Sequence, residues 1–347
     1  MAEAEQVILH VGQCSLFGKS YNDIGALLAR SCACSSVYFS CSVGIRCSDA
    51  CQSLVQEEGI AATARSARVM AKGRLYMQAA LPMYDWPEVR WASEALWATL
   101  QVSFAKHGIE APPKLCQPGD LMSLWQSFDL VLAQTCGLPY ATSLRSRVRL
   151  VGTPSYDIGC APGFYYSVLI TPAGHAFDGL ERFFGRIAVN GTDSQSGFAA
   201  LQLALLRPNG SPRGALDICQ TGSHRASIKA VAEGRAELAA IDVVSFKLAL
   251  RHMPETAAVT VVGCTSPTPG LPLITARPAV ELEPMRAAVR EAIVGLGNEC
   301  RKALLITGFE VIEDRAYDVV EAGWRLLEDR GLAYTGQSAD IAAVGLR

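Results

Sequence analysis

From residue 73 to about residue 330, the chain alternates short apolar runs with segments of helical periodicity. The clearest runs are RIAVN at residues 186–190 and LAAID at residues 238–242, and helical patterns follow them at 198–206 and 243–251. Strands that alternate with helices predict a mostly parallel sheet with helices on both faces. Because two such sets follow each other and the last elements can return to the first, we expect two α/β lobes joined by crossing strands.

Capping signals predict where two of the helices begin and end. Pro87 suits the first position of a helix, Asp85 is a candidate cap, and Gly108 is a typical terminator. Ser223 is the candidate N-cap of a second helix at residues 224–233.

Composition excludes several classes of protein. The 347 residues carry a formal net charge of −2, which argues against broad nucleic-acid binding because that needs a basic surface. No run of about 18 apolar residues is present, so we expect no membrane insertion. The chain begins MAEAEQ and no apolar segment of a signal peptide follows, which indicates a cytoplasmic protein for the sequence as written.

The first part of the chain differs in kind from the rest. Residues 31–53 consist mostly of Ser and Cys and lack a helical or strand period. We therefore expect residues 1–69 to be an atypical Ser/Cys-rich extension. Six of the 12 cysteines lie between Cys14 and Cys51, but none has the C-x2-C spacing of a zinc site. The sequence predicts neither a metal site nor a cofactor.

The stretch NGTDSQSGF at residues 190–198 is the strongest candidate for a binding loop. A strand ends there, a polar loop with two glycines follows, and a helix begins near Ser196. Peptide NH groups at a helix start have no internal partners and attract anions, and the hydroxyls of Ser194 and Ser196 add donors. The alternative is simple N-capping of the helix by Asp193 or Ser194.

Other polar residues follow predicted strands, where ligands bind in open α/β sheets. The alternatives are ordinary: Tyr84 as packing, Asp242 as a helix cap, and His224 as a surface residue at a helix start. The recurrence of such residues at several strand ends favours a site. These residues are Tyr84, Asp85, Gln134, Thr135, Tyr140, His224, Arg225 and Asp242.

Eight segments, taken in order over about residues 74–333, resemble the phosphate, phosphite and phosphonate substrate-binding proteins of ABC transporters. They are ALPMYDWPEVRWASEALW, LVLAQTCGLPYAT, RLVGTPSYD, YYSVLI, VNGTDSQSGFAAL, TGSHRASIKAVAEGRAELAAIDVVSF, GLPLITA and LLITGFEV.

The resemblance implies a two-lobed type-2 periplasmic-binding-protein fold, with mixed, mostly parallel sheets and crossing hinge strands, and a periplasmic location. It places lobe one at residues 73–166 and 259–333 and lobe two at residues 167–258. The crossing segments are expected near residues 165–171 and 258–276.

The resemblance also implies how the anion is held. In the family, a Ser-x-Ser-Gly turn at a helix start holds it between the lobes, and this turn corresponds to Ser194–Gly197 here. Gln195 departs from the hydroxyl residue that phosphonate binders have at the middle position. Tyr84 and His224 match an aromatic and a histidine of the family, and Asp242 or Asp85 is placed to accept from a ligand amine. The full candidate set is Tyr84, Asp85, Gln134, Thr135, Tyr140, Tyr166, Ser194, Gln195, Ser196, Gly197, His224 and Asp242.

Three functions follow as hypotheses. The first is reversible binding of a small oxyanion by closure of the lobes, for an ABC permease. The second is an enzyme on the same scaffold, similar to proteins of thiamine-pyrimidine synthesis, with Ser196, His224 and Asp242 as a triad, although motifs such as G-x-S-x-G are absent. The third is a ligand sensor whose amphipathic helix at residues 315–330 docks a signalling partner.

Overall fold

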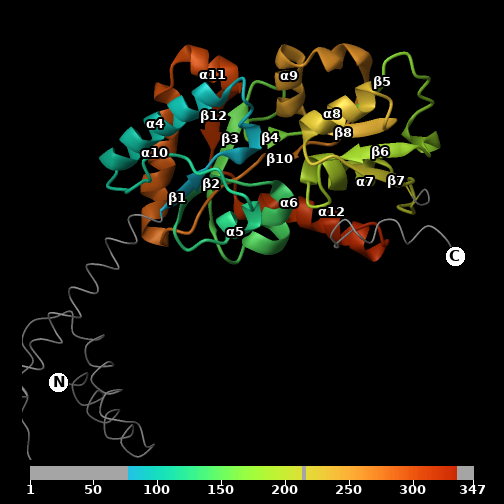
Figure 1. The fold of residues 1–347 in the computed structure, drawn as a ribbon. Coiled ribbons are helices and arrows are strands. Elements are labelled where there is room, and N and C mark those ends of the chain that lie inside the picture. Colours follow the sequence, from blue (N-terminus) through green and yellow to red (C-terminus); the bar gives the residue numbers. More distant parts are fainter. Residues whose placement is uncertain (1–76, 213–215, 334–347) are drawn as a thin grey trace, which may run out of the picture. The chain divides into compact units, whose positions relative to one another are not determined.

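The structure is a computed structural model that describes residues 77–212 and 216–333 (Figure 1). The predicted extension at residues 1–69 lies outside the described residues. Two five-stranded sheets form the framework, and each has its own helices.

The first sheet uses strands from both ends of the described chain. Helices α4 (Arg90–Lys106), α10 (Leu282–Gly295) and α11 (Asn298–Leu304) pack together beside it (Figure 1). All five residues of its strand β2 are buried, as expected for a strand covered on both faces. The strand order is β1 (Gln78–Ala80), β2 (Leu130–Gln134), β11 (Leu273–Thr275), β3 (Arg149–Tyr156) and β12 (Ile306–Glu310).

The second sheet is built from the middle of the chain. Its parallel strands end at a common edge, where α7 (Ala200–Ala204), α8 (His224–Ala232) and α9 (Val243–His252) follow. A π-helical turn, η4 (Gln195–Ala199), leads directly into α7. The strand order is β7 (Asp217–Gln220), β6 (Arg186–Val189), β8 (Leu238–Asp242), β5 (Ser167–Pro172) and β9 (Val259–Cys264).

Two segments cross between the sheets, as the sequence predicted. The outgoing segment contains β4 (Phe164–Tyr165) and the returning one contains β10 (Thr268–Pro269), and the two strands pair antiparallel. Both sheets are mixed, and their parallel share is smaller than expected. The pairs β1–β2, β6–β7 and β6–β8 are parallel, whereas β11 and β12 in the first sheet and β5 in the second run antiparallel to their neighbours.

Strand β9 corrects one boundary. We expected residues from 259 onward in lobe one, but Val259–Cys264 pairs with β5 in the second sheet, and the return crossing follows it. The partner of a strand is a non-local property that its own residues do not specify.

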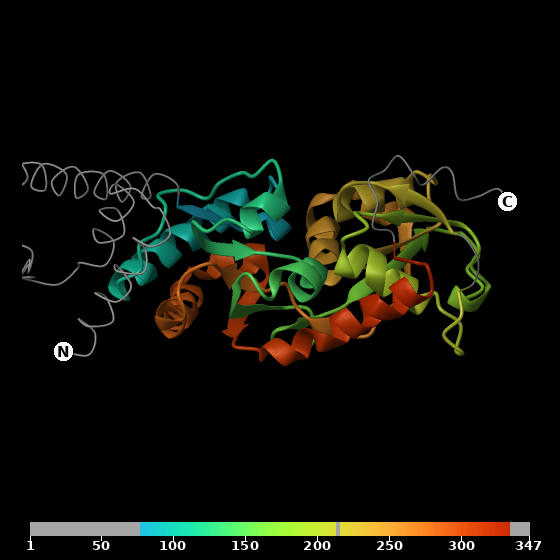
Figure 2. The ribbon, with the colours of Figure 1, turned by 90° about the horizontal axis from the view of Figure 1, so that it is seen from below.

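A third connection runs from the first sheet to helix α12 (Asp318–Asp329), which packs against α7 and η4 and also against η2 (Tyr140–Leu144). Figure 2 shows α12 (red) reaching from the junction of the two halves along the second one. Tyr317, just before α12, is fully buried and donates a 2.8 Å hydrogen bond to the carbonyl of Gly270 in the return crossing. The helix predicted at residues 315–330 as a docking site for a partner is thus packed, as α12, against other elements of the same chain.

Most helix limits agree with the sequence, and the first helix does not. Helix α4 begins at Arg90 rather than at Pro87, and no side chain in the described part of the chain caps it. Asp85 instead accepts hydrogen bonds from Arg90 and Gln117. None of the described helices is both long enough and apolar enough to cross a membrane.

Candidate functional site

A cleft of about 380 Å³ lies between the two sheets. From the first half it is bounded by the 3-10 turn η1 (Pro82–Tyr84), which follows β1, and from the second half by the loops that follow β6, β7 and β8. This is the carboxyl edge of the parallel strands, where ligands of α/β proteins bind. The polar lining residues are Tyr84, Asn190, Asp193, Ser194, Ser196, Ser223, His224, Arg225, Asp242 and Ser245.

The loop after β6 is organised by a serine cap. The NH of Gly197 donates to Ser194 Oγ over 3.0 Å, so Ser194 is the N-cap and Asp193 is not. The NH of Gln195 donates to Cys136 Sγ over 3.3 Å. Capping and an anion site are compatible here, because Ser194 makes the cap, whereas Ser196 lines the cleft and takes no part in capping.

Ser196 and His224 form a hydrogen-bonded pair in the wall of the cleft. Ser196 Oγ and His224 Nε2 are 2.8 Å apart, although the two residues come from different helix starts. Burial lowers the pKa of His224 to about 4, against a smaller opposing influence of the Ala240 backbone. His224 Nδ1 nevertheless has no partner in hydrogen-bonding geometry among the described residues. The imidazole is neutral at pH 7 and carries one donor and one acceptor.

Tyr84 and Asp242 make an inner contact across the cleft. The Tyr84 hydroxyl donates to Asp242 Oδ2 over 2.7 Å, and the NH of Ser245 donates to Asp242 Oδ1 over 2.9 Å. Asp242 therefore caps α9 and also joins the two halves. Burial raises the pKa of Asp242 to about 6, although both hydrogen bonds oppose the shift, and burial followed by the charge of Asp242 raises the pKa of Tyr84 well above its ordinary value.

Arg225 and Glu88 make a second contact at the rim. The guanidinium of Arg225 donates two hydrogen bonds, of 2.8 and 2.7 Å, to the Glu88 carboxylate, and it lies 4.9 Å from the ring centroid of Trp86. The hydrogen bonds from Arg225 lower the pKa of Glu88 to about 2. Arg225 belongs to the second half, whereas Glu88 and Trp86 belong to the first. Among the described lining residues it is the one Lys or Arg side chain.

Five of the predicted site residues line the cleft: Tyr84, Ser194, Ser196, His224 and Asp242. Gly197 supports them, because a Cβ at this position would clash with Asn190 Oδ1 and press against the ring of His224.

The remaining candidates lie elsewhere. Gln195 is buried against Gly137, and Thr135 is buried with its hydroxyl directed at the Cys136 carbonyl. Tyr140 donates to Asp314, and Tyr166 donates to the Ile158 carbonyl. Asp85 pairs with Arg90, and Gln134 donates to Tyr156, away from the cleft.

The full candidate set omitted two lining residues, Trp86 and Arg225, although the strand-end pattern included Arg225 beside His224. Arg225 directly follows His224 and so occupies the first turn of the same helix. Trp86 lies two residues after Tyr84, in the loop that follows β1. Proximity to a predicted strand end was sufficient to propose both. Clusters of three or more potential metal ligands are absent from the described residues.

Comparison with known proteins shows which family the chain belongs to. A family model described as the periplasmic substrate-binding protein of a phosphonate ABC transporter matches residues 126–317, which is more than half of the chain. No curated protein matches the sequence.

Solved structures share the fold at low sequence identity. A protein from Xanthomonas citri bound to ATP has a TM-score of 0.57 and 16% identity, and the alignment covers 73% of this chain and 97% of that one. A binding protein component of a phosphonate ABC transporter from Pseudomonas aeruginosa has a TM-score of 0.56 and 17% identity, with coverages of 77% and 92%. PhnD1 from Prochlorococcus marinus in complex with methylphosphonate has a TM-score of 0.55 and 16% identity, with coverages of 72% and 97%.

These solved structures support the two-lobed fold. The family model assigns the chain to a group of solute-binding proteins. The chain belongs to the family of periplasmic substrate-binding proteins of phosphonate ABC transporters.

Proposed function

We propose that the protein binds a small oxyanion of the phosphonate or phosphate type in the cleft between the two sheets and releases it unchanged. The observation that carries this proposal is the convergence of helix starts on one cleft. The turn η4 and helix α8 both begin there, with Ser196 and Ser223 beside them. Family membership and the methylphosphonate complex of PhnD1 add support.

Neutral donors are well suited to an oxyanion. Peptide NH groups at a helix start carry partial positive charge, and hydroxyls and a neutral imidazole add hydrogen bonds without a counter-charge. A hydrogen bond to a charged group contributes about 1.5–3 kcal/mol. Three or four such bonds therefore reach the roughly 8 kcal/mol that micromolar affinity requires.

Closure follows from the two contacts across the cleft. Tyr84–Asp242 and Arg225–Glu88 each join one residue of the first half to one of the second. A ligand that bridges the halves favours this closed arrangement, and the paired crossing strands β4 and β10 are the natural hinge. We propose that each lobe consists of one five-stranded sheet with its helices. We propose that an ABC permease recognises the closed, ligand-bound form.

The geometry gives the enzymatic alternative little support. A triad requires Asp242 to orient His224. Both carboxylate oxygens of Asp242 are instead engaged by Tyr84 and by the NH of Ser245. In this proposal Ser196 therefore donates to the ligand while His224 Nε2 donates to Ser196 Oγ, and no turnover is expected.

Isothermal titration with methylphosphonate, phosphate, phosphite and sulfate tests the proposal. We expect one of the phosphorus oxyanions to bind with micromolar affinity or better, and Ser196→Ala to weaken it by about 10- to 150-fold through loss of a charge-assisted hydrogen bond. Ser143→Ala, a change at an exposed serine outside the cleft, is the matched control. Absence of binding by all four anions, or equal binding by both variants, would reject the proposed site.

A further inference from the structure

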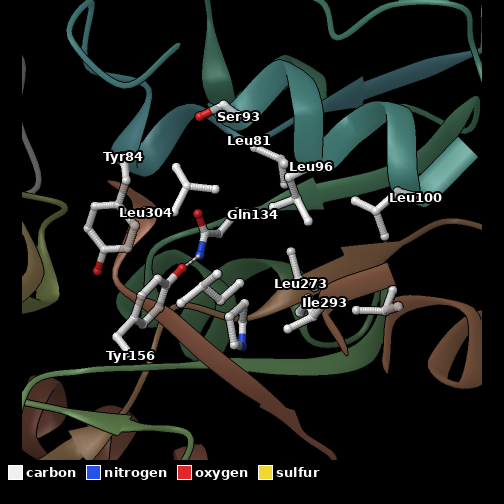
Figure 3. Close-up of a pocket in the computed structure, with 13 residues that line it drawn as sticks. Leu81, Tyr84, Ser93, Leu96, Leu100, Gln134, Tyr156, Leu273, Ile293 and Leu304 are labelled. Atoms are coloured by element: carbon white, nitrogen blue, oxygen red, sulfur yellow. Dashed lines mark hydrogen bonds between the residues drawn. The ribbon is translucent and has the colours of Figure 1, made fainter. Parts of the chain in front are cut away.

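The two walls of the cleft are supported in different ways. On the first-half side, Figure 3 shows Tyr84 beside Tyr156, and Gln134 Nε2 donates to the Tyr156 hydroxyl over 3.1 Å, so this wall is supported from within its own half. On the second-half side, the turn η4 carries Ser196 in the wall of the cleft and receives contacts from elements of both halves. The support of η4 therefore depends on how the two halves are joined.

The turn η4 depends on its neighbours for its geometry. It is a single π-helical turn with the sequence QSGFA, and its glycine adds conformational freedom. Ser167 Oγ holds the turn from one side, by donating to the Ser196 carbonyl over 2.9 Å. Phe198 is the one large apolar side chain of the turn and is fully buried, so its packing holds the turn from another side.

Helix α12 packs on this buried side of η4. The rings of Phe198 and Trp324 lie with their centroids 6.3 Å apart and their planes inclined by 59°. The helix approaches closely at Gly323, where a Cβ would come within 2.9 Å of Leu203 in α7, the helix that continues η4. Trp324 is 9% exposed, and its indole NH donates to Glu328 over 2.8 Å. A well-fixed ring of α12 thus lies against the turn that carries Ser196.

Arg145 fastens the base of α12 to the first half. Its guanidinium, directly after η2, pairs with Asp314 over 3.0 Å, with Asp318 over 2.8 Å and with Glu321 over 3.2 Å. The Arg145 side chain is 23% exposed, and a network of this kind is stronger than an isolated surface pair. These ion pairs set where α12 leaves the first half, and so where Trp324 meets η4.

We propose that Trp324 and Arg145 are positioning residues for oxyanion binding, which act through α12 on the hydroxyl of Ser196. Neither residue lines the cleft, so an effect on the ligand must pass through the turn. Donors of a binding site must be held within about 0.5 Å of their productive positions, so a relaxed turn loses affinity although every contacting residue is kept. The inference rests on the proposed function and deepens it, because it names residues outside the cleft that set the affinity.

Isothermal titration with methylphosphonate and with phosphate tests the role of Trp324. We expect Trp324→Ala to weaken binding by about tenfold or more, because the turn is no longer held in place. Trp324→Phe keeps a ring against Phe198 and is expected to restore the affinity to within about threefold. Leu327→Ala is the matched control: Leu327 is fully buried on the same helix, so its truncation also leaves a cavity, but it is not part of the ring pair. We expect this control to bind within about twofold of the unmodified protein.

Arg145→Gln is a second test, which leaves the apolar packing of α12 intact. We expect it to weaken binding about three- to fivefold, and the difference from the unmodified protein to shrink as NaCl is raised. Arg325→Gln is the matched control, because Arg325 pairs with the same Glu321 but lies within α12 and does not link the helix to the first half.

Urea unfolding shows that each variant is folded before titration, and the Arg145 variant decides alone if Trp324→Ala does not fold. Trp324 loses its positioning role if Trp324→Ala binds as well as Leu327→Ala, and Arg145 loses it if Arg145→Gln binds as well as Arg325→Gln. In either case the cleft stands. If neither anion binds the unmodified protein, the proposed function fails and the positioning role fails with it.

Discussion

The two contacts that join the halves differ in their surroundings. The inner contact, Tyr84–Asp242, is buried, with the two residues 7% and 1% exposed. The rim contact, Arg225–Glu88, leaves 39% and 29% of its side chains exposed. Burial makes the inner contact sensitive to protonation, whereas solvent and salt screen the rim contact. The inner contact is therefore expected to respond to pH and the rim contact to salt.

The largest effect is expected at Asp242. Its pKa rises from 3.8 to about 6 on folding, so the folded state binds the proton more tightly and stability falls as pH rises from about 4 to 6. At about 1.4 kcal/mol per pKa unit, the loss reaches about 3 kcal/mol. Asp242→Asn keeps a side-chain acceptor for Ser245 and removes the charge. We expect the variant to match the original protein near pH 4 and to exceed it by about 3 kcal/mol at pH 7, measured by urea unfolding.

An unchanged difference between the two proteins across pH 4–7 would contradict this expectation, because it would mean that Asp242 titrates normally in the folded state. Ligand titration of the same variant then shows whether the charge serves binding.

His224 is expected to give an effect of similar size and opposite direction. Its pKa falls from 6.5 to about 4, so the unfolded state binds the proton more tightly and stability is lost as pH falls from about 6.5 to 4. His224→Gln removes this dependence and is expected to gain about 3 kcal/mol relative to the original protein between pH 7 and pH 4. The pH dependences of stability from Asp242 and His224 nearly cancel in the unmodified chain. Urea unfolding of both single variants at several pH values is therefore needed to detect either contribution. A parallel response of the two variants to pH would contradict the opposite signs.

A smaller effect is expected when the inner contact loses one hydrogen bond. Tyr84→Phe removes the hydroxyl that donates to Asp242 and keeps the ring beside Tyr156. Loss of a hydrogen bond to a charged group costs about 1.5–3 kcal/mol, and we expect the lower end because Ser245 still donates to the carboxylate. Urea unfolding at pH 7 measures the loss of stability. Tyr166→Phe is the control, because the Tyr166 hydroxyl donates to the uncharged carbonyl of Ile158 in a partly buried position. A larger loss of stability in Tyr166→Phe than in Tyr84→Phe would contradict the expectation that the bond to the charged Asp242 is the stronger one.

The smallest effect is expected at the rim. A partly exposed ion pair contributes about 0.2–1 kcal/mol, so Glu88→Gln and Arg225→Gln are each expected to weaken methylphosphonate binding only about two- to fivefold. The difference from the original protein is expected to shrink as NaCl is raised, because salt screens the pair. Titration at low and high salt measures it. Tighter binding by Glu88→Gln would show that the freed guanidinium contacts the ligand, which would move Arg225 from closure to recognition.

The secondary structure followed closely from local signals. Strand β8 occupies Leu238–Asp242 as the apolar run LAAID predicted, and Ser223 caps α8 through the NH of Ala226. The start of α4 was misplaced because Pro87 is compatible with a turn as well as with a first helical residue. Strand β12 and helix α11 were missed, since their short patterns did not separate from the neighbouring helices.

The site was predicted in part. Residues at strand ends in the second half were placed well, because strands β6, β7 and β8 end at one edge and bring their loops together. Gln134 ends β2 and Tyr140 lies shortly after it, yet the structure turns these side chains toward Tyr156 and Asp314. The sequence thus predicts that a polar residue lies at a strand end, but it does not predict which way the side chain points.

Periodicity, capping residues and apolar runs act over a few residues, and so the sequence by itself determined most of the helices and strands, the two successive α/β sets and the position of the polar loop that follows β6. Only the tertiary structure decided that β9 pairs with β5 in the second sheet, that Tyr84 meets Asp242, 158 positions away, and that Arg225 meets Glu88, 137 positions away. These pairings depend on which surfaces meet after the sheets form and the chain has crossed between them, and that information is not carried by either partner's neighbours in the sequence.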